Sequence, residues 1–433
     1  MASLRGSGSR GGGGPHQLFA ILLIIQAGVL VDCFTTPSSL RSNIGTIHGP
    51  KTIANTAGLT TSPSHLPSSV HLKQYGRLSK SMMKMTSTPA LNNGEIPDSN
   101  DNSSSATTTT TTTGKRPSFP VVLWRFTRPH TLIGSALAIP AIHMLAAPTY
   151  SEVFTLKTLA SIIFASIPAL FMNLYITGLN QITDVDIDRI NKPDLPIAAG
   201  HLSLPTAKAI VIFSGIFSLA MGLSHPFLST NGLSVALWAS FILGTMYSLP
   251  PIRFKRFHLL AAFCIIAVRG AVINAGFYAH AQAAAFGGGA GTTVIGCLLS
   301  DTRCALSSLF FSVFGFVIAL MKDVPDVKGD KESNIKTMPV RYGQHRIFGS
   351  VRRLLTVSFL SIGIGFLKGA ANAPSQVLTT CRTILGVSSV LAGYSVRKEA
   401  VSVDPEDSKQ VYKYYMHLWK LFYASYLVLP FAR

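Results

Sequence analysis

Long apolar stretches alternate with short polar connections from about residue 118 to the end of the chain. Each stretch has close to the ~20 residues that a helix needs to cross a bilayer. The pattern predicts an all-α, polytopic membrane protein with nine spanning helices. We expect them near residues 130–148, 156–180, 205–224, 232–250, 257–280, 305–322, 354–372, 377–396 and 412–430. In the seventh, Gly363, Gly365 and Gly369 predict an interruption.

The first 117 residues lack this alternation. An apolar run from Leu18 to Val31 is too short to span comfortably, but it is typical of a signal-peptide core. From Cys33 to Gly94 there is no acidic residue, while Ser, Thr, Lys and Arg are frequent, as in transit peptides. A threonine run follows. We therefore expect a leader and polar linker over 1–117 and a membrane domain over 118–433.

A signal core followed by transit-like sequence resembles the two-part leaders of proteins sent to plastids of secondary origin. Cys33-Phe34-Thr35-Thr36-Pro37 resembles the phenylalanine-marked cleavage site of such leaders. This interpretation predicts a multi-pass protein of a plastid membrane. An ordinary secretory signal followed by a disordered arm is the alternative.

Composition supports the membrane class, because 48% of the residues are hydrophobic and only 13% are charged. The net charge of +19 could suggest nucleic acid, but the basic residues are scattered around apolar segments and no nucleic-acid module is recognisable. The five cysteines include no Cys-x-x-Cys, so neither zinc nor a disulfide framework is indicated. Connections 2–3, 4–5, 6–7 and 8–9 carry eighteen Lys and Arg residues against four on the opposite side, a positive-inside asymmetry.

The first chemically suggestive stretch ends the second apolar segment. Asn180, Asp184 and Asp188 are spaced i, i+4 and i+8, so on one helix all three would share a face, and Pro193 forbids further helix. Stacked oxygen ligands favour a hard divalent cation, and Mg²⁺ commonly brings a phosphate. An EF-hand opening fits poorly, because Arg189 occupies the position that needs Gly. A solvated acidic helix end is the other alternative.

A second acidic stretch follows the sixth apolar segment on the same predicted side of the membrane. Asp323, Asp326 and Asp330 are spaced i, i+3 and i+7, and Pro325 predicts a kink among them. Two facing carboxylate clusters repel each other unless cations lie between them, so the pair predicts two Mg²⁺ ions. A polar loop of mixed charge is the alternative.

Cations lie on the same predicted side. The connection Tyr247-Ser248-Leu249-Pro250-Pro251-Ile252-Arg253-Phe254-Lys255-Arg256 turns at two prolines and then presents three basic residues. Carboxylates, metal, Arg and Lys together are how proteins hold a polyanion such as diphosphate. A positive-inside flank explains the charge equally well. Arg269 lies inside the fifth apolar segment, where an unpaired charge is costly, and we expect it to face a cavity.

These motifs carry a family resemblance over roughly residues 120–433. The Asn-x-x-x-Asp-x-x-x-Asp pattern, the Tyr-Ser-x-x-Pro-x-Arg-x-Lys loop, the second Asp-x-x-x-Asp and the nine helices resemble the UbiA superfamily of intramembrane aromatic prenyltransferases. Asn180-Gln181, Lys322-Asp323 and Trp124-Arg125-Phe126-Thr127-Arg128-Pro129-His130-Thr131 resemble the plastid homogentisate prenyltransferases within it. The residues Asp194 and His201 depart from the subgroup pattern.

The resemblance implies a fold and a chemistry. It implies a nine-helix bundle in which Asn180, Asp184, Asp188, Asp326 and Asp330 hold Mg²⁺ on an allylic prenyl diphosphate. The implied substrate-binding residues are Arg253, Lys255, Asp323, Arg269, Tyr247, Tyr175, Lys192 and Arg128. An allylic carbocation would need a dry pocket with aromatic faces, for which Tyr175, Tyr247 and Tyr278 are candidates.

The implied reaction joins a phytyl, geranylgeranyl or solanesyl group to homogentisate with loss of CO₂, for tocopherol or plastoquinone synthesis. No protein partner is indicated. Another aromatic acceptor, such as hydroxybenzoate, dihydroxynaphthoate or chlorophyllide, is the sister alternative. A cation-coupled transporter is the alternative from another class, and it would place carboxylates in mid-helix and show an internal repeat.

Overall fold

The computed structural model describes residues 117–289 and 291–432. In that part of the chain the only bridge between extended segments joins Phe257 and Lys336, and all other regular structure is helical. The all-α expectation is therefore confirmed. Nearly all of the leader assigned to residues 1–117 lies outside the described residues, and the division at residue 117 stays a prediction.

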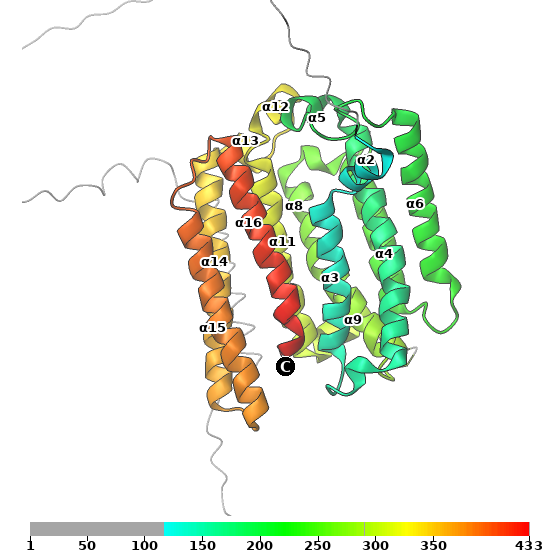
Figure 1. The fold of residues 1–433 in the computed structure, drawn as a ribbon, viewed down its shortest axis with the longest axis vertical. Coiled ribbons are helices and arrows are strands. Elements are labelled where there is room, and N and C mark those ends of the chain that lie inside the picture. The colour runs from blue at the N-terminus through cyan, green and yellow to red at the C-terminus, as the bar shows by residue number, and fades with distance from the viewer. Residues whose placement is uncertain (1–116, 290, 433) are drawn as a thin grey trace, which may run out of the picture. The chain divides into compact units, whose positions relative to one another are not determined.

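The nine expected segments all coincide with long helical stretches (Figure 1). These are α3 (Pro129–Ala146), α4 (Leu156–Thr183), α6 (Leu204–Ser224), α7 (Asn231–Ser248), the composite α8–η4–α9, α11 (Thr302–Asp323), α14 (Gln344–Ala371), α15 (Gln376–Glu399) and α16 (Ser408–Val428). Seven of them are long and apolar enough to cross a membrane, and α7 and α16 are not among the seven. Lysines in α16 and small polar residues in α7 lower their hydropathy, so the count of nine spans is not confirmed.

Short helices lie between the long ones. They are α2 (Phe119–Phe126), η2 (Glu152–Phe154), α5 (Val185–Asn191), η3 (Phe254–Arg256), α10 (Val294–Ser300), α12 (Val327–Glu332), α13 (Met338–Tyr342) and η5 (Leu429–Phe431). The composite stretch comprises α8 (His258–Ile266), the π-helical turn η4 (Ala267–Val272) and α9 (Ile273–Ala284). A single π turn inserted in an α-helix frequently marks a functional position.

The expected interruption of the seventh segment is wrong. Helix α14 begins earlier, at Gln344, and runs unbroken through its glycines. Gly363 faces Gly386 of α15, and a Cβ added at Gly363 would lie 2.9 Å from the Gly386 carbonyl oxygen and 2.8 Å from Val390. These glycines therefore serve close packing of the two helices, as small residues do in membranes, and they do not break the helix.

Helix α11 is the most enclosed of the apolar helices. Its aromatic side chains pack on α14 and α16: the rings of Phe311 and Tyr426 stack with centroids 3.8 Å apart, and Phe314 meets Phe359 and Phe422 edge to face. Such pairs fix the relative register of helices more sharply than aliphatic contacts. Because α11 ends at the second acidic stretch, this packing also sets where those carboxylates lie.

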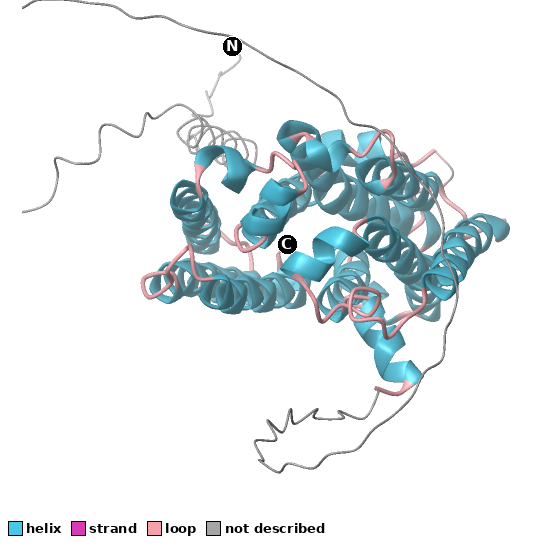
Figure 2. Cartoon of the chain, turned by 90° about the horizontal axis from the view of Figure 1, so that it is seen from above, coloured by secondary structure: helices cyan, strands magenta, loops and turns pink. Residues whose placement is uncertain are grey.

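The breaks that follow α4 and α11 lie at the same end of the helices, where α5 and α12 are neighbours (Figure 1). Figure 2 looks down on this end. Both acidic stretches therefore reach one side of the bundle, as the charge asymmetry of the connections predicts.

Candidate active site

The first acidic stretch does not form one continuous helix, contrary to the sequence-based expectation. Helix α4 ends at Thr183, and Asp184 has non-helical backbone angles (φ −118°, ψ 16°) before α5 starts at Val185. The break does not separate the ligands, because the Asn180 amide donates to Asp184 Oδ2 over 2.8 Å. A local hydrogen bond thus keeps Asn180 and Asp184 side by side, as a continuous helix would have done.

The two acidic residues of helix α5 differ in their exposure to solvent. Asp188 is buried, whereas the Asp186 side chain is 93% exposed and pairs with Arg189. The two carboxylates lie two residues apart on one short helix and face opposite environments. Asp188 therefore belongs to the site, and Asp186 is a solvated surface charge.

The second acidic stretch contains the expected break. Helix α11 ends at Asp323, Pro325 lies in the gap, and Asp326 precedes the first turn of α12. Asp326 and Asp330 are buried, and Asp330 accepts a hydrogen bond from Thr337 Oγ1 over 3.2 Å. The kink places these carboxylates across the end of the bundle from α5.

Direct contacts join the two stretches. The Gly329 backbone N–H donates to Asn191 Oδ1 over 3.0 Å, and Lys192 forms an ion pair with Asp326. The charges of Asp184 and Asp326 both act on Asp188. Carboxylates more than 130 residues apart in sequence therefore share one electrostatic environment.

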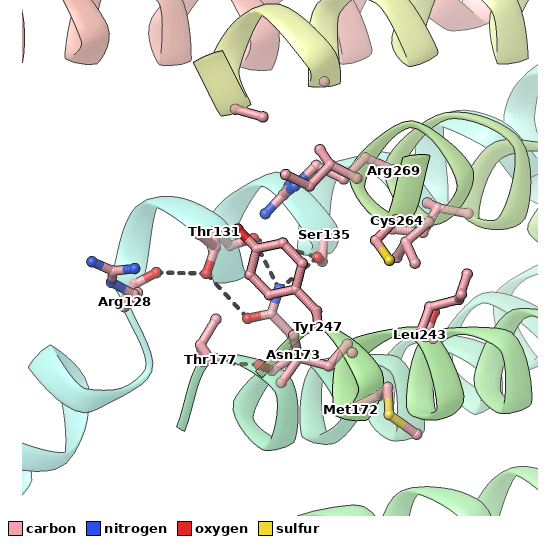
Figure 3. Close-up of a pocket in the computed structure, with 18 of the residues that line it drawn as sticks. Arg128, Thr131, Ser135, Met172, Asn173, Thr177, Leu243, Tyr247, Cys264 and Arg269 are labelled. Carbon is pink, nitrogen blue, oxygen red and sulfur yellow. Dashed lines mark hydrogen bonds between the residues drawn. The ribbon is translucent and has the colours of Figure 1, made fainter. Parts of the chain in front are cut away.

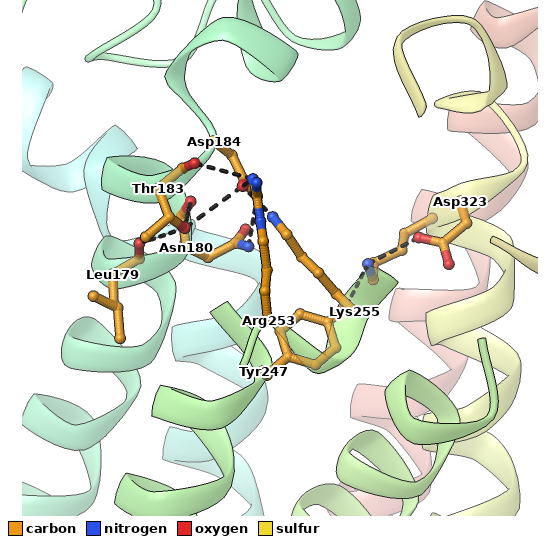
Figure 4. Close-up of polar contacts among 9 residues, drawn as sticks. Leu179, Asn180, Thr183, Asp184, Tyr247, Arg253, Lys255 and Asp323 are labelled. Carbon is orange, nitrogen blue, oxygen red and sulfur yellow. Dashed lines mark hydrogen bonds and ion pairs between the residues drawn. The ribbon is translucent and has the colours of Figure 1, made fainter. Parts of the chain in front are cut away.

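The cationic connection lies against the first stretch (Figure 4). After the Pro250–Pro251 turn, Arg253 donates from Nη2 to Asp184 Oδ1 over 2.7 Å and to the Thr183 carbonyl over 3.1 Å. Lys255 is buried and pairs with the same Asp184 oxygen. Two cations thus meet one carboxylate.

Two arginines at this end have backbone angles that side-chain-bearing residues rarely adopt. Arg128 has φ 52° and Arg253 has φ 37°, and each stands directly before a helical turn. The Nε of each is buried and has no hydrogen-bond partner among the residues that the structure describes. Strained backbone is characteristic of functional sites, and the spare donors suit an anionic ligand.

Burial and mutual repulsion weaken the acidity of this cluster. Burial, opposed by Lys192 and Arg128 and reinforced by Asp184 and Asp326, raises the pKa of Asp188 to about 6. Burial, reinforced by Asp323 and Asp326, raises the pKa of Asp330 to about 7. Burial lowers the pKa of Lys255, although Asp184 acts in the opposite direction. Crowded carboxylates of this kind gain from a cation.

The donor set fits Mg²⁺ by its chemistry. Asn180, Asp184, Asp188, Asp326 and Asp330 supply only oxygen ligands, which hard cations prefer. Over residues 117–289 and 291–432, no three His, Cys, Asp or Glu side chains converge closely enough to hold a metal ion. The carboxylates are instead paired with basic side chains, from Lys192, Arg253 and Lys255. A metal could therefore be held only after these basic side chains move away from the carboxylates.

A cavity of about 200 Å³ opens beneath this end, among the apolar helices (Figure 3). The predicted metal-binding and substrate-binding residues that line it are Arg128, Asn180, Tyr247 and Arg269. Lys322 also lines it, donating to the Tyr247 hydroxyl over 3.3 Å and to Asp323 over 2.9 Å. This lysine therefore links the second acidic stretch to the cavity, and the family resemblance did not assign it a role.

Three polar residues of the cavity wall were missed by sequence reasoning. Asn173 on α4 accepts from Thr131 Oγ1 over 3.1 Å and donates to Ser135 Oγ over 3.1 Å, both on α3. Thr131 and Ser135 are spaced i, i+4 and so share one face of α3, which was the available signal in the sequence. Asn173 is 42 residues from Thr131, and nothing in the local spacing places it opposite that face.

Two of the three tyrosines expected in the pocket lie elsewhere. Tyr175 points its hydroxyl to Thr245 over 2.7 Å and stacks on Phe241, outside the cavity lining. Tyr278 hydrogen-bonds Asp301 near the opposite end of α11. Both are packing residues with satisfied hydroxyls, because helix rotation turns them away from the cavity. Only Tyr247 of the three faces it.

Comparison with known proteins gives a consistent result. Residues 121–421 match the model of the UbiA prenyltransferase family. The chain is similar to the chloroplastic homogentisate phytyltransferase 1 of Arabidopsis thaliana, with 39% identity over 72% of this chain and 75% of that protein. It is also similar to the chloroplastic homogentisate solanesyltransferase of Arabidopsis thaliana, with 35% identity over 72% and 77%. A UbiA homolog from Archaeoglobus fulgidus, solved bound to GPP and Mg²⁺, is 16% identical over 71% of this chain and 99% of its own, with a TM-score of 0.48.

Proposed function

The chain belongs to the UbiA prenyltransferase family, and we propose that it transfers a prenyl group from its diphosphate to homogentisate, with loss of the carboxyl group as CO₂. The product would be a prenylated quinol of the tocopherol or plastoquinone type. The similar plant proteins bear the name chloroplastic, and seven helices are apolar enough to span. A plastid membrane is therefore the location that we propose, and delivery through a two-part leader to a secondary plastid is a further proposal.

One observation carries the proposed chemistry. Two buried carboxylate clusters meet at one end of the bundle, beside Arg253 and Lys255 and above a largely apolar cavity. A diphosphate needs a metal and cations, while an allylic carbocation needs a dry, apolar space. The molecule supplies these two environments next to each other.

The metal would be Mg²⁺, held by Asn180, Asp184, Asp188, Asp326 and Asp330. When bound, it would help neutralise the charge that builds on the departing diphosphate. Arg253, Lys255, Lys192 and Arg128 would bind phosphate oxygens, so the lysines would exchange their present carboxylate partners for the substrate. These cations are already at the site and would offset part of the charge of the diphosphate.

The cavity would hold the prenyl carbon and the acceptor. Tyr247 presents an aromatic ring there, and its hydroxyl accepts from Lys322. An aromatic face stabilises a passing carbocation without offering a base that would quench it. The apolar walls would exclude water, which otherwise would capture the cation as an alcohol. The electron-rich quinol ring then forms the new carbon–carbon bond.

Neither alternative class fits as well. A transporter would need carboxylates in mid-helix, whereas those of the two clusters lie at helix ends and breaks. Other acceptors remain conceivable for a UbiA fold, but the similar proteins described above act on homogentisate by name. The same two names differ in their donor, phytyl against solanesyl, so donor length is left to experiment.

The test is prenyl transfer by membranes containing the protein. They would receive labelled homogentisate, Mg²⁺ and, separately, phytyl, geranylgeranyl and solanesyl diphosphates. Labelled lipid product with at least one donor, lost on adding EDTA, supports the proposal and identifies the donor. Product only with hydroxybenzoate, dihydroxynaphthoate or chlorophyllide would keep the family and reject homogentisate as acceptor.

A further inference from the structure

Arg269 is a cation without a counter-ion in the apolar part of the bundle. It lies on the π turn η4 inside the span His258–Ala284 and lines the cavity. Over residues 117–289 and 291–432, no ion pair joins it to a carboxylate. The tyrosines Tyr415, Tyr423 and Tyr426 act on its charge, and Arg269 in turn acts on His130. A charge in this position is costly, and such residues mark ligand pathways.

The surrounding structure holds Arg269 in place. Asn274 donates to the carbonyls of Arg269 and Gly270 over 2.9 and 2.8 Å, which satisfies acceptors that the π turn would leave free. The guanidinium lies 5.3 Å from the centroid of the Trp419 ring. At Gly315 a Cβ would come within 3.0 Å of the Arg269 Cβ, so only glycine leaves that space open. Three helices thus contribute to positioning one side chain.

The position of Arg269 separates it from the cluster that would hold diphosphate. It follows His258, the first residue of α8, by eleven residues, which is about 16 Å of helix. Asn173 precedes Asn180 on α4 by seven residues, which is about 10 Å of helix, so Asn173 and the Ser135 hydroxyl to which it donates also lie away from Asn180 along the bundle. Figure 3 shows the Arg269 side chain reaching toward Thr131 and Ser135.

We propose that Arg269 binds the carboxylate of the aromatic acid and so selects an acidic acceptor. The Asn173 cluster on the facing wall would contact the ring hydroxyls, and the ring would lie between the two, beneath the diphosphate cluster. A guanidinium matches a carboxylate with two parallel hydrogen bonds, and Arg269 and the Asn173 cluster line the same cavity. This inference rests on the proposed function and adds the residue that distinguishes the acid from a neutral quinol.

The test compares homogentisate with a neutral analogue, 2-(2,5-dihydroxyphenyl)ethanol, in which a hydroxymethyl group replaces the carboxylate. Equilibrium binding of each would be measured by calorimetry on the purified full chain, with Mg²⁺ and a thiolodiphosphate analogue of the donor present. Arg269→Met removes the charge, Arg269→Lys keeps it without the planar fork, and Arg397→Met changes an exposed arginine on α15.

We expect Arg269→Met to weaken homogentisate binding roughly ten- to a hundredfold and the neutral analogue by no more than about twofold. Arg269→Lys should give a smaller loss for homogentisate, and Arg397→Met should match the wild type. Binding of the thiolodiphosphate analogue should stay unchanged in every variant, which also shows that each is folded.

Three outcomes would overturn the inference. Equal effects of Arg269→Met on both acceptors would mean that the arginine only shapes the pocket. Selective loss of the thiolodiphosphate analogue would assign Arg269 to the donor. A wild-type protein that binds the donor analogue but no homogentisate would defeat the proposed acceptor itself, and that failure appears without any substitution.

Discussion

Helix α11 carries a polar network at each of its ends, and the two networks are built differently. At its start, Asp301 accepts from the Arg303 backbone over 2.9 Å, pairs with the Arg303 guanidinium over 2.9 Å and accepts from the Tyr278 hydroxyl. Arg303 also donates to the Leu145 carbonyl over 3.2 Å. The two charged side chains at this end, Asp301 and Arg303, thus neutralise each other.

At the other end of α11, several buried acids lie close together: Asp323 pairs with Lys322, Asp326 pairs with Lys192, and Asp330 accepts from the Thr337 hydroxyl. Asp323, Asp326 and Asp330 act on one another, and burial helps to raise the pKa of Asp330 to about 7. By contrast, although burial alone would raise it, hydrogen bonds from Arg303 and Tyr278 hold the pKa of Asp301 below its usual value. A closed network lowers the free energy of the fold, whereas a crowded one keeps charge available for a ligand. The arrangement of partners, more than the number of acidic residues, therefore distinguishes the network at the start of α11 from the candidate site at its end.

The largest expected effect comes from breaking the crowded end. Asp184→Asn keeps the side-chain shape but removes the charge that meets Arg253 and Lys255. We expect kcat/KM for prenyl transfer to fall roughly a hundred- to a thousandfold, because the proposed metal ligand loses its charge and Arg253 and Lys255 lose their carboxylate partner. Asp186→Asn is the matched control, since that carboxylate is solvated on the neighbouring helix, and it should act like the wild type. If both variants lost kcat/KM equally, the effect would come from the net negative charge of the stretch and not from the position of Asp184.

A smaller effect follows from pH. Asp188 and Asp330 have pKa values raised to about 6 and about 7, so both take up protons as the pH falls through that range. A protonated carboxyl does not bind Mg²⁺, and the proton therefore competes with the metal. The Mg²⁺ concentration for half-maximal activity should rise on the order of tenfold between pH 8 and pH 6. A requirement that stays constant over this range would show that neither group binds the metal.

The smallest effect on catalysis should come from the closed end. Asp301→Asn removes the charge that pairs with Arg303 but keeps a side-chain oxygen that can cap the helix, and we expect the free energy of unfolding to fall by about 1–3 kcal/mol. Transfer activity below the unfolding temperature should remain within about twofold. Thermal unfolding in detergent, followed together with activity, measures both. A large loss of activity in a protein that stays folded would contradict the structural role of this end.

The sequence predicted the helices well, because a bilayer requires apolar runs of one length. It also predicted the break at Pro325, where covalent geometry forbids a regular helix. It could not predict that α4 stops at Thr183, because no proline or glycine marks that point, and the side chains of Asn180 and Asp184 stay hydrogen-bonded across the break. Tertiary contacts decide such ends.

The site was predictable where its ligands repeat along one segment and not where single residues meet across helices. The i, i+4, i+8 spacing identifies Asn180, Asp184 and Asp188 in the sequence. The Asn173–Ser135 contact, by contrast, joins residues that are 38 apart. Tyr175 and Tyr278 were misplaced because an aromatic residue in an apolar helix faces packing neighbours as readily as a cavity. The position of Arg269 at a cavity was predictable, because a charged side chain within an apolar membrane segment is costly unless it faces a polar space or a ligand.

The most direct test of the central claim is the binding of a labelled prenyl diphosphate to the purified protein, with and without Mg²⁺. If the crowded end is the metal-diphosphate site, tight binding should require Mg²⁺, disappear in Asp184→Asn and persist in both Asp186→Asn and Asp301→Asn. Binding of equal strength in EDTA, or binding that Asp184→Asn leaves unchanged, would contradict it.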